Sequence, residues 1–189
     1  CSEHLFSHYL DMTEYRYHGK FQSHGFQCAM GTVIMSACFD EFLKMDLSKI
    51  DVDACVAAWP TLEQEQQRAL EIFKDFPVPQ LGYTEITKKY NDAETVRQQL
   101  TKVKENWPEL KERIQNQVYT YDKMVALMKS VGAPVGPESI GLTRAQVRRM
   151  VDFVQLMRWR INLFDLCKRA QIYDALLDRV FGKGGVLEI

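Results

Sequence analysis

Hydrophobic side chains recur every three or four residues along most of the chain, whereas stretches that alternate apolar and polar residues are rare. A spacing of three or four places apolar side chains on one face of an α-helix. We expect a first helix over residues 2–16 and a second, more apolar helix over residues 23–45, separated by a polar turn through His18, Gly19 and Lys20. The pattern predicts an all-α fold in which no parallel sheet can form.

Capping residues mark where further helices begin. Thr61 and Thr143 are each followed three residues later by a glutamine, the arrangement in which two side chains satisfy free amides at a helix start. The first of these helices is expected to end near Phe73, and another should run from an Asn-Asp cap at 91–92 to about Trp107. After Thr143, one buried stripe is predicted at Val147, Met150, Val151 and Val154.

One long amphipathic helix is expected between Pro108 and Gly132. Proline is tolerated in the first turn of a helix, and glycine suits a left-handed C-terminal stop. The apolar positions of this segment are Leu110, Ile114, Val118, Tyr121, Val125 and Met128. A last helix follows near Ile172 to Val180 and is closed by Gly182. We interpret residues 1–189 as one domain built as a multi-helix bundle.

Charge and composition exclude several classes of function. The chain has 24 Lys and Arg against 25 Asp and Glu, so it has no overall positive field that would attract nucleic acid. No apolar run approaches the roughly 18 residues that cross a bilayer, and no basic and apolar leader opens the chain. We therefore expect a cytoplasmic protein without a membrane span. Because the sequence begins without methionine, we also expect the true N-terminus to lie elsewhere.

The cysteines indicate reduced thiols. The five are spaced neither as a disulfide framework nor as metal-ligand pairs, and they are Cys1, Cys28, Cys38, Cys55 and Cys167. We therefore expect reduced thiols in a cytosolic protein.

All the histidines fall in the first 24 residues, as His4, His8, His18 and His24. His4 and His8 are one helical turn apart and share a face, and His24 opens the next helix, so three imidazoles can converge on one point. Neutral imidazole is a favoured ligand of zinc and related ions. The alternative is that four exposed or core histidines cluster by chance.

Carboxylates near these histidines could add oxygen ligands, and the candidates are Glu3, Asp11 and Glu14. A charge that is solvated or lies at a helix N-terminus is the more common role for such residues. Asp11, one turn after His8, could also orient that ring.

Several segments resemble the C-terminal half of glycerol-1-phosphate dehydrogenases, which belong to the iron-containing alcohol dehydrogenase and dehydroquinate synthase superfamily. The segments are Ser2-Glu3-His4-Leu5-Phe6-Ser7-His8, His24-Gly25-Phe26, Gly31-Thr32, Gly132-Ala133-Pro134, residues 137–143 and residues 158–165. The similarity covers both ends of the chain, while the middle, from about Asp46 to Trp107, is generic helix. The resemblance implies the helical domain of dehydroquinate synthase-like enzymes.

The resemblance also implies roles for three histidines. In that family one aspartate from before this segment and two histidines hold the metal, and the histidines match His4 and His24. His8 matches a position near the substrate, where an imidazole could bond a hydroxyl or pass a proton, although a surface histidine is an equal alternative. His18 is expected to be a turn residue. Zinc is the expected metal, with nickel or iron as alternatives that the same ligands suit.

The nicotinamide cofactor has no site in this sequence. The family binds NAD(P) on a Rossmann-like N-terminal domain, and the chain contains neither GxGxxG nor GGG, so we assign no cofactor-binding residue. The glycines at 182, 184 and 185 follow a helix, which is the wrong context. The chain thus resembles the helical half of a two-domain enzyme. By itself it is expected to fold, to bind metal weakly and to be inactive.

For the intact enzyme the resemblance implies reversible hydride transfer between NAD(P)H and dihydroxyacetone phosphate, giving sn-glycerol 1-phosphate, a step of phospholipid metabolism. Family members are often homodimers. Candidate partners for the substrate phosphate are Lys20, Arg158 and Arg160. Two alternatives stay open, namely a dehydrogenase of glycerol or another polyol with the same fold, and a non-catalytic helical interaction module.

Overall fold

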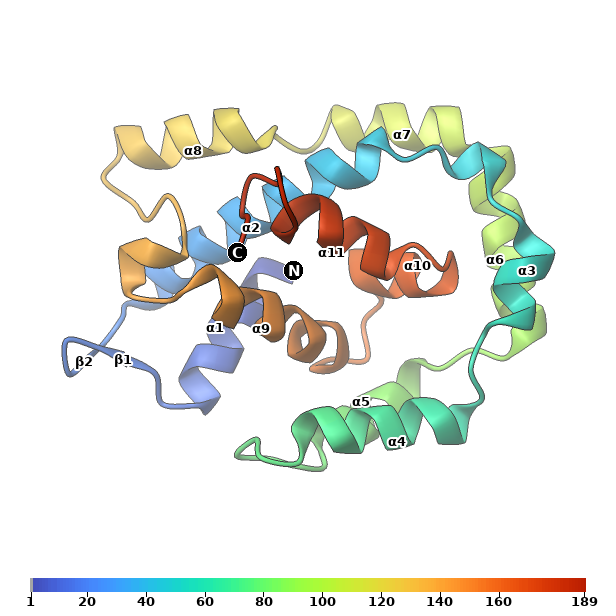
Figure 1. The fold of residues 1–189 in the computed structure, drawn as a ribbon, viewed down its shortest axis with the longest axis horizontal. Helices are drawn as coiled ribbons and strands as arrows, with labels where there is room; N and C mark the ends of the chain where they lie inside the picture. The colour runs from blue at the N-terminus through green and yellow to red at the C-terminus, as the bar shows by residue number, and fades with distance from the viewer. Residues whose placement is uncertain (1) are drawn as a thin grey trace.

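The computed structural model describes residues 2–189 and is helical over most of this range (Figure 1). Eleven α-helices and two short 3₁₀ segments are present within the described residues. In chain order they are α1 Ser2–Met12, α2 His24–Lys44, η1 Leu47–Lys49, α3 Val52–Ala57, α4 Leu62–Phe73, α5 Leu81–Lys89, α6 Ala93–Glu105, α7 Trp107–Gln115, α8 Tyr121–Ser130, η2 Pro137–Ile140, α9 Arg144–Leu156, α10 Leu163–Arg169 and α11 Tyr173–Phe181. The all-α prediction is confirmed.

Helix α2 is the centre of the fold, and α1, α8 and α11 pack against it while α9 packs on α1 (Figure 1). Its sequence is apolar on nearly all sides, and twelve of its residues are buried. A helix that is hydrophobic all round belongs in a core. The largest side chains with almost no exposure include Phe42 of α2 and, on other helices, Phe6, Phe164 and Phe181.

Helices α3 to α6 form an arm that leaves this core and returns to it. In Figure 1, α3 and α6 lie side by side at one end of the molecule, and α4 lies along α5. A small second cluster of buried side chains holds α3 and α6 to α10, and it consists of Cys55, Val96, Leu100 and Ala170. The arm brings α5 against α9, and Glu85 of α5 lines a cavity together with His4 and His8 of α1.

The capping predictions are confirmed. Thr61 and Thr143 both form capping boxes, in which Gln64 and Gln146 return a side-chain bond to the cap residue. Asp92 caps α6, whose last residue is Glu105. The stripe predicted on α9 is completely buried, with exposed fractions of 1% or less at Val147, Met150, Val151 and Val154.

Two element predictions are wrong. The single helix expected from Pro108 to Gly132 is two helices, because Thr120 caps α8 and the Tyr121 amide donates to the Asp40 carboxylate of α2. The first helix ends at Met12 instead of residue 16. After it, a two-stranded antiparallel hairpin follows, with β1 at Arg16–Tyr17 and β2 at Lys20–Phe21.

Candidate metal centre

The site is built where the first turn of α1 meets the first turns of α2. Ser23 caps α2, and its hydroxyl accepts a hydrogen bond from the Phe26 amide at 3.2 Å, so the helix begins at His24. Gly31, two turns further along, allows the close approach of α1. A Cβ atom at Gly31 would lie 2.5 Å from the backbone oxygen of Glu3. The lack of a side chain at Gly31 therefore places His4 next to His24.

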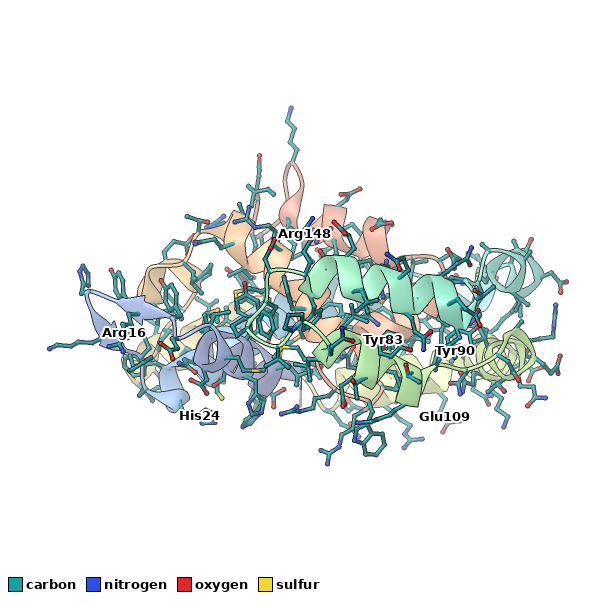
Figure 2. The ribbon with its side chains drawn as sticks, turned by 90° about the horizontal axis from the view of Figure 1, so that it is seen from below. Arg16, His24, Tyr83, Tyr90, Glu109 and Arg148 are labelled. Atoms are coloured by element: carbon teal, nitrogen blue, oxygen red, sulfur yellow. The ribbon has the colours of Figure 1, made fainter. Side chains whose placement is uncertain are left out.

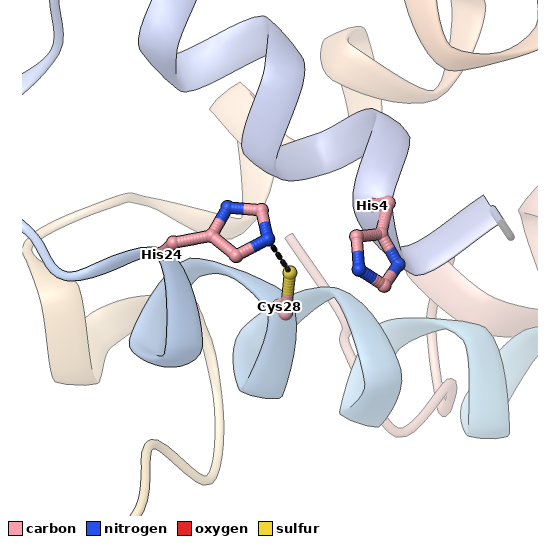
Figure 3. Close-up of side chains that lie close together, drawn as sticks. All are labelled: His4, His24 and Cys28. Carbon is pink, nitrogen blue, oxygen red and sulfur yellow. Dashed lines mark hydrogen bonds between the residues drawn. The ribbon is translucent and has the colours of Figure 1, made fainter.

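The rings of His4 and His24 lie together, with their centroids 5.4 Å apart. Figure 3 shows them approaching the sulfur of Cys28, which lies one turn after His24 on α2. The potential ligand atoms of His4, His24 and Cys28 are all within 4.8 Å of one another. Both imidazoles are exposed, and Cys28 is half-buried, so an ion can reach the group from solvent. In Figure 2, His24 lies at the margin of the molecule.

Hydrogen bonds determine which nitrogen His24 offers to a metal. The Ser7 hydroxyl donates to Oε1 of Gln27 at 2.6 Å and lies 2.8 Å from Nδ1 of His24. Gln27 in turn donates from Nε2 to the Gln22 carbonyl at 3.3 Å. Because Ser7 uses its single hydrogen on Gln27, its oxygen can only accept from Nδ1–H of His24. The other nitrogen, Nε2, then carries the lone pair and lies 3.4 Å from Sγ of Cys28.

This arrangement is typical of metal sites, where the ligating histidine donates its second N–H to a neighbouring group that fixes the tautomer. His4 shows a parallel feature, since its Nδ1 lies 3.2 Å from Oε1 of Glu3. A hydrogen on Nδ1 of His4 leaves Nε2 as the ligand nitrogen. The residues present therefore fit a borderline divalent ion such as zinc.

His8 belongs to a neighbouring cavity and not to this ligand group, so the three imidazoles do not converge on one point. The cavity has a volume of about 590 Å³. His4 and His8 line one wall, and the other lining residues are Ser2, Leu5, Glu85, Arg158, Trp159, Arg160, Ile161 and Asn162. The cavity thus begins at a candidate ligand and extends to two cationic side chains.

The pKa of His8 is lowered from its ordinary value, first by burial and then by the positive charge of Arg158. The carboxylate of Asp11 opposes this shift and raises the pKa. A neutral His8 can accept a hydrogen bond or a proton from a molecule in the cavity.

Polar contacts hold the segment from Arg158 to Asn162 that lines the cavity. The Glu85 carboxylate accepts a hydrogen bond from the backbone amide of Trp159 at 2.7 Å and another from Lys88 at 2.7 Å. Asn162 caps α10 by accepting from the amides of Phe164 and Asp165. The guanidinium of Arg160 lies 5.8 Å from the centre of the Trp159 ring. These contacts fix the loop that carries both arginines.

The remaining sequence candidates lie elsewhere. His18 occupies the turn of the β1–β2 hairpin, where its φ of 51° and that of Gly19, 74°, match a tight hairpin turn. Lys20 lies on β2 and is not among the cavity-lining residues. Within residues 2–189, neither Asp11 nor Glu14 belongs to the ligand group.

Cys28 was not predicted. It follows His24 by four residues, the same one-turn spacing that relates His4 to His8, and this spacing is the signal that could have found it. Burial raises the pKa of the Cys28 thiol.

Comparisons with protein families, curated proteins and solved structures give no match for this chain. Among the described helices, none is both long and apolar enough to cross a membrane.

Proposed function

We propose that this chain is the metal-binding helical domain of an NAD(P)-dependent sn-glycerol-1-phosphate dehydrogenase, with a fold of the dehydroquinate synthase-like type. The observation that carries the proposal is the meeting of His4 and His24 beside a cavity that also holds His8 and Arg158. The resemblance of the histidine segments to that family supports the same assignment.

His4 and His24 would hold the metal, which we propose to be zinc, with nickel or iron as alternatives. When bound, the ion would polarise a substrate oxygen and stabilise the negative charge that develops on it. His8 lies within the same cavity and would accept a hydrogen bond from a substrate hydroxyl or exchange its proton.

Arg158 and Arg160 give the cavity its phosphate-binding character, because a guanidinium presents paired donors to phosphate oxygens. The cavity volume of about 590 Å³ is ample for a phosphorylated three-carbon substrate such as dihydroxyacetone phosphate. These two arginines favour a phosphorylated substrate over glycerol.

The described residues do not fit a nicotinamide dinucleotide. Residues 2–189 contain one two-stranded antiparallel sheet and no parallel strands, so no strand and helix N-terminus form a pyrophosphate site there. We assign the cofactor to another domain of a larger, homodimeric and cytoplasmic enzyme. This chain alone is expected to show no reduction of dihydroxyacetone phosphate by NADH or NADPH, and turnover by it would contradict that assignment.

A ligand titration followed by NMR tests the substrate class. The zinc-loaded chain is titrated with sn-glycerol 1-phosphate, glycerol and inorganic phosphate, and the His8 ring and Trp159 indole signals are monitored. We expect sn-glycerol 1-phosphate to shift both signals at concentrations where glycerol shifts neither. Replacing Arg158 by glutamine should weaken binding by about tenfold or more, because a hydrogen bond to a charged group contributes about 1.5–3 kcal/mol.

Arg148→Gln provides the matched control. Arg148 pairs with Asp152 at 3.2 Å on α9 and does not line the cavity, and Figure 2 shows it on the side of the molecule opposite His24. Equal shifts with glycerol would favour the polyol dehydrogenase. No shift with any of the three compounds would contradict a catalytic role and favour the interaction module.

A further inference from the structure

Cys28 stands in a ligand position that the two-histidine site leaves open. Its Sγ lies 3.4 Å from Nε2 of His24, and both atoms lie within 4.8 Å of a ligand atom of His4. In a tetrahedral zinc site with bonds of about 2.0–2.1 Å to nitrogen and about 2.3 Å to sulfur, neighbouring ligand atoms are about 3.3–3.6 Å apart. The His24–Cys28 pair already has this spacing, and the His4 ligand atom, which lies within 4.8 Å of the other two, would have to approach them by at most about 1.5 Å.

The surrounding helices hold the group in place. His24 and Cys28 project from successive turns of α2, and the Ser7 and Gln27 side chains that orient His24 are fully buried. His4 is held against α2 by the close contact at Gly31. Three donors therefore come from two helices whose relative position is fixed by packing, which favours a preformed site.

A competing reading of the same contacts is a cysteine nucleophile activated by His24. The Ser23 cap accepts from the Phe26 amide, and Cys28 lies in the helix interior, where backbone amides bond within the helix. The backbone amides next to the thiol are therefore bonded along the helix and are not directed at a position where an oxyanion would form. The third donor, His4, has no role in such a dyad but is accounted for by a metal.

We propose that Cys28 is a third protein ligand, so that His4, His24 and Cys28 together bind one zinc ion within this chain. The inference rests on the proposed function only in taking His4 and His24 as ligands. On binding, the Cys28 thiol loses its proton to solvent and the thiolate bonds the ion. A sulfur ligand favours zinc, cobalt or cadmium over magnesium and calcium, and three ligands from this chain leave one tetrahedral position for an oxygen supplied from outside it.

Cobalt(II) substitution tests the proposal, because a thiolate ligand gives cobalt a charge-transfer absorption in the near ultraviolet. Cys1 lies outside the described residues, so the experiment uses Cys1→Ser as the background for every protein. We expect one cobalt ion per chain with the thiolate absorption. The Cys28→Ser substitution should remove this absorption. Zinc affinity should fall by at least about 100-fold, since losing even a group that only orients a ligand costs about 10–100-fold.

Two further variants make the result interpretable. Cys55→Ala removes a buried thiol on α3 and should leave absorption and affinity unchanged. Cys28→Asp replaces the sulfur ligand by oxygen and should restore part of the zinc affinity without the thiolate absorption. If the serine variant does not fold, the aspartate variant still tests whether Cys28 is a ligand.

The outcomes separate this inference from the proposed function. If the thiolate absorption is absent from the Cys1→Ser parent, or persists in Cys28→Ser, Cys28 is not a ligand. If in that case metal binding still requires His4 and His24, the two-histidine site of the proposed function stands. Binding that requires neither histidine would overturn both.

Discussion

The hydroxyl oxygen of Ser7 lies 2.8 Å from Nδ1 of His24, and it accepts the hydrogen on that nitrogen because its own hydrogen is donated to Gln27. A buried side chain on α1 thus decides which nitrogen His24 on α2 presents to solvent. The same bond ties the first turns of the two helices together. We therefore expect the proposed metal affinity and the helix packing to be coupled through Ser7.

Ser7→Ala should weaken zinc binding by about 10–100-fold, because His24 would lose the group that fixes its tautomer. It should also cost about 1–3 kcal/mol of stability, since the buried Gln27 oxygen loses its donor. Zinc competition and urea unfolding measure the two effects. Ser36→Ala is the control, because Ser36 is buried on α2 but donates to the Thr32 carbonyl at 3.0 Å. Equal zinc affinity of the Ser7 and Ser36 variants would contradict the role of Ser7.

Two glycines of α2 should respond oppositely to alanine. At Gly31 the new Cβ would lie 2.5 Å from the Glu3 backbone oxygen, so α1 must shift, and we expect a loss of about 1–3 kcal/mol. At Gly25 nothing lies within 4 Å, and alanine should stabilise the helix by up to about 1 kcal/mol. Urea unfolding of the metal-free chain measures both. Similar stabilities of the two variants would show that α1 does not depend on Gly31.

Acid should destabilise the metal-free chain through His8. Burial and Arg158 hold the folded-state pKa of His8 below the unfolded value near 6.5. Between the folded-state pKa and pH 6.5 the unfolded chain binds more protons than the folded chain, so stability rises with pH across this range. Stability is lowest at pH values below the folded-state pKa. NMR titration of the ring should give a pKa below 6.5, and Arg158→Gln should raise it while Arg148→Gln should not. A pKa of His8 at or above 6.5 would contradict this account.

Lys89 of α5 stabilises the loop that lines the cavity. Its ammonium lies 2.8 Å from the Asp165 carboxylate, and both are buried; Asp165 also accepts from the Asn162 amide at 2.9 Å. Lys89→Met would leave that carboxylate without its charged partner, and we expect a loss of about 3–5 kcal/mol. Lys44→Gln is the control, since Lys44 pairs with Glu41 near the surface and should change unfolding only slightly. An equal effect of both substitutions would show that Asp165 does not need Lys89.

Local signals predicted much of the fold. The threonine caps at 61 and 143 and the stripe from Val147 to Val154 depend on nearby residues, and these predictions are confirmed. The break between α7 and α8 depends on a contact of Tyr121 with Asp40, 81 positions away, which periodicity cannot detect. The apolar spacing of three or four residues continues across the break, so the sequence predicted one helix.

The site was predictable in part, for the same reason. The placement of His4 beside His24 could be anticipated from their positions on two consecutive helices, although the resemblance supplied their roles. His8 shares α1 with His4 but lines the cavity, since a one-turn spacing does not specify which neighbour each ring meets. The spacing between cysteines did not indicate Cys28, because the side chain that Cys28 contacts is that of His24.

The most direct test of the central claim is a crystal structure of the zinc-loaded chain with anomalous scattering at the zinc edge. The account predicts one strong peak per chain, bonded at about 2.0–2.1 Å to a ring nitrogen of both His4 and His24. A peak bonded to only one of these rings, or one located elsewhere in the chain, would contradict it.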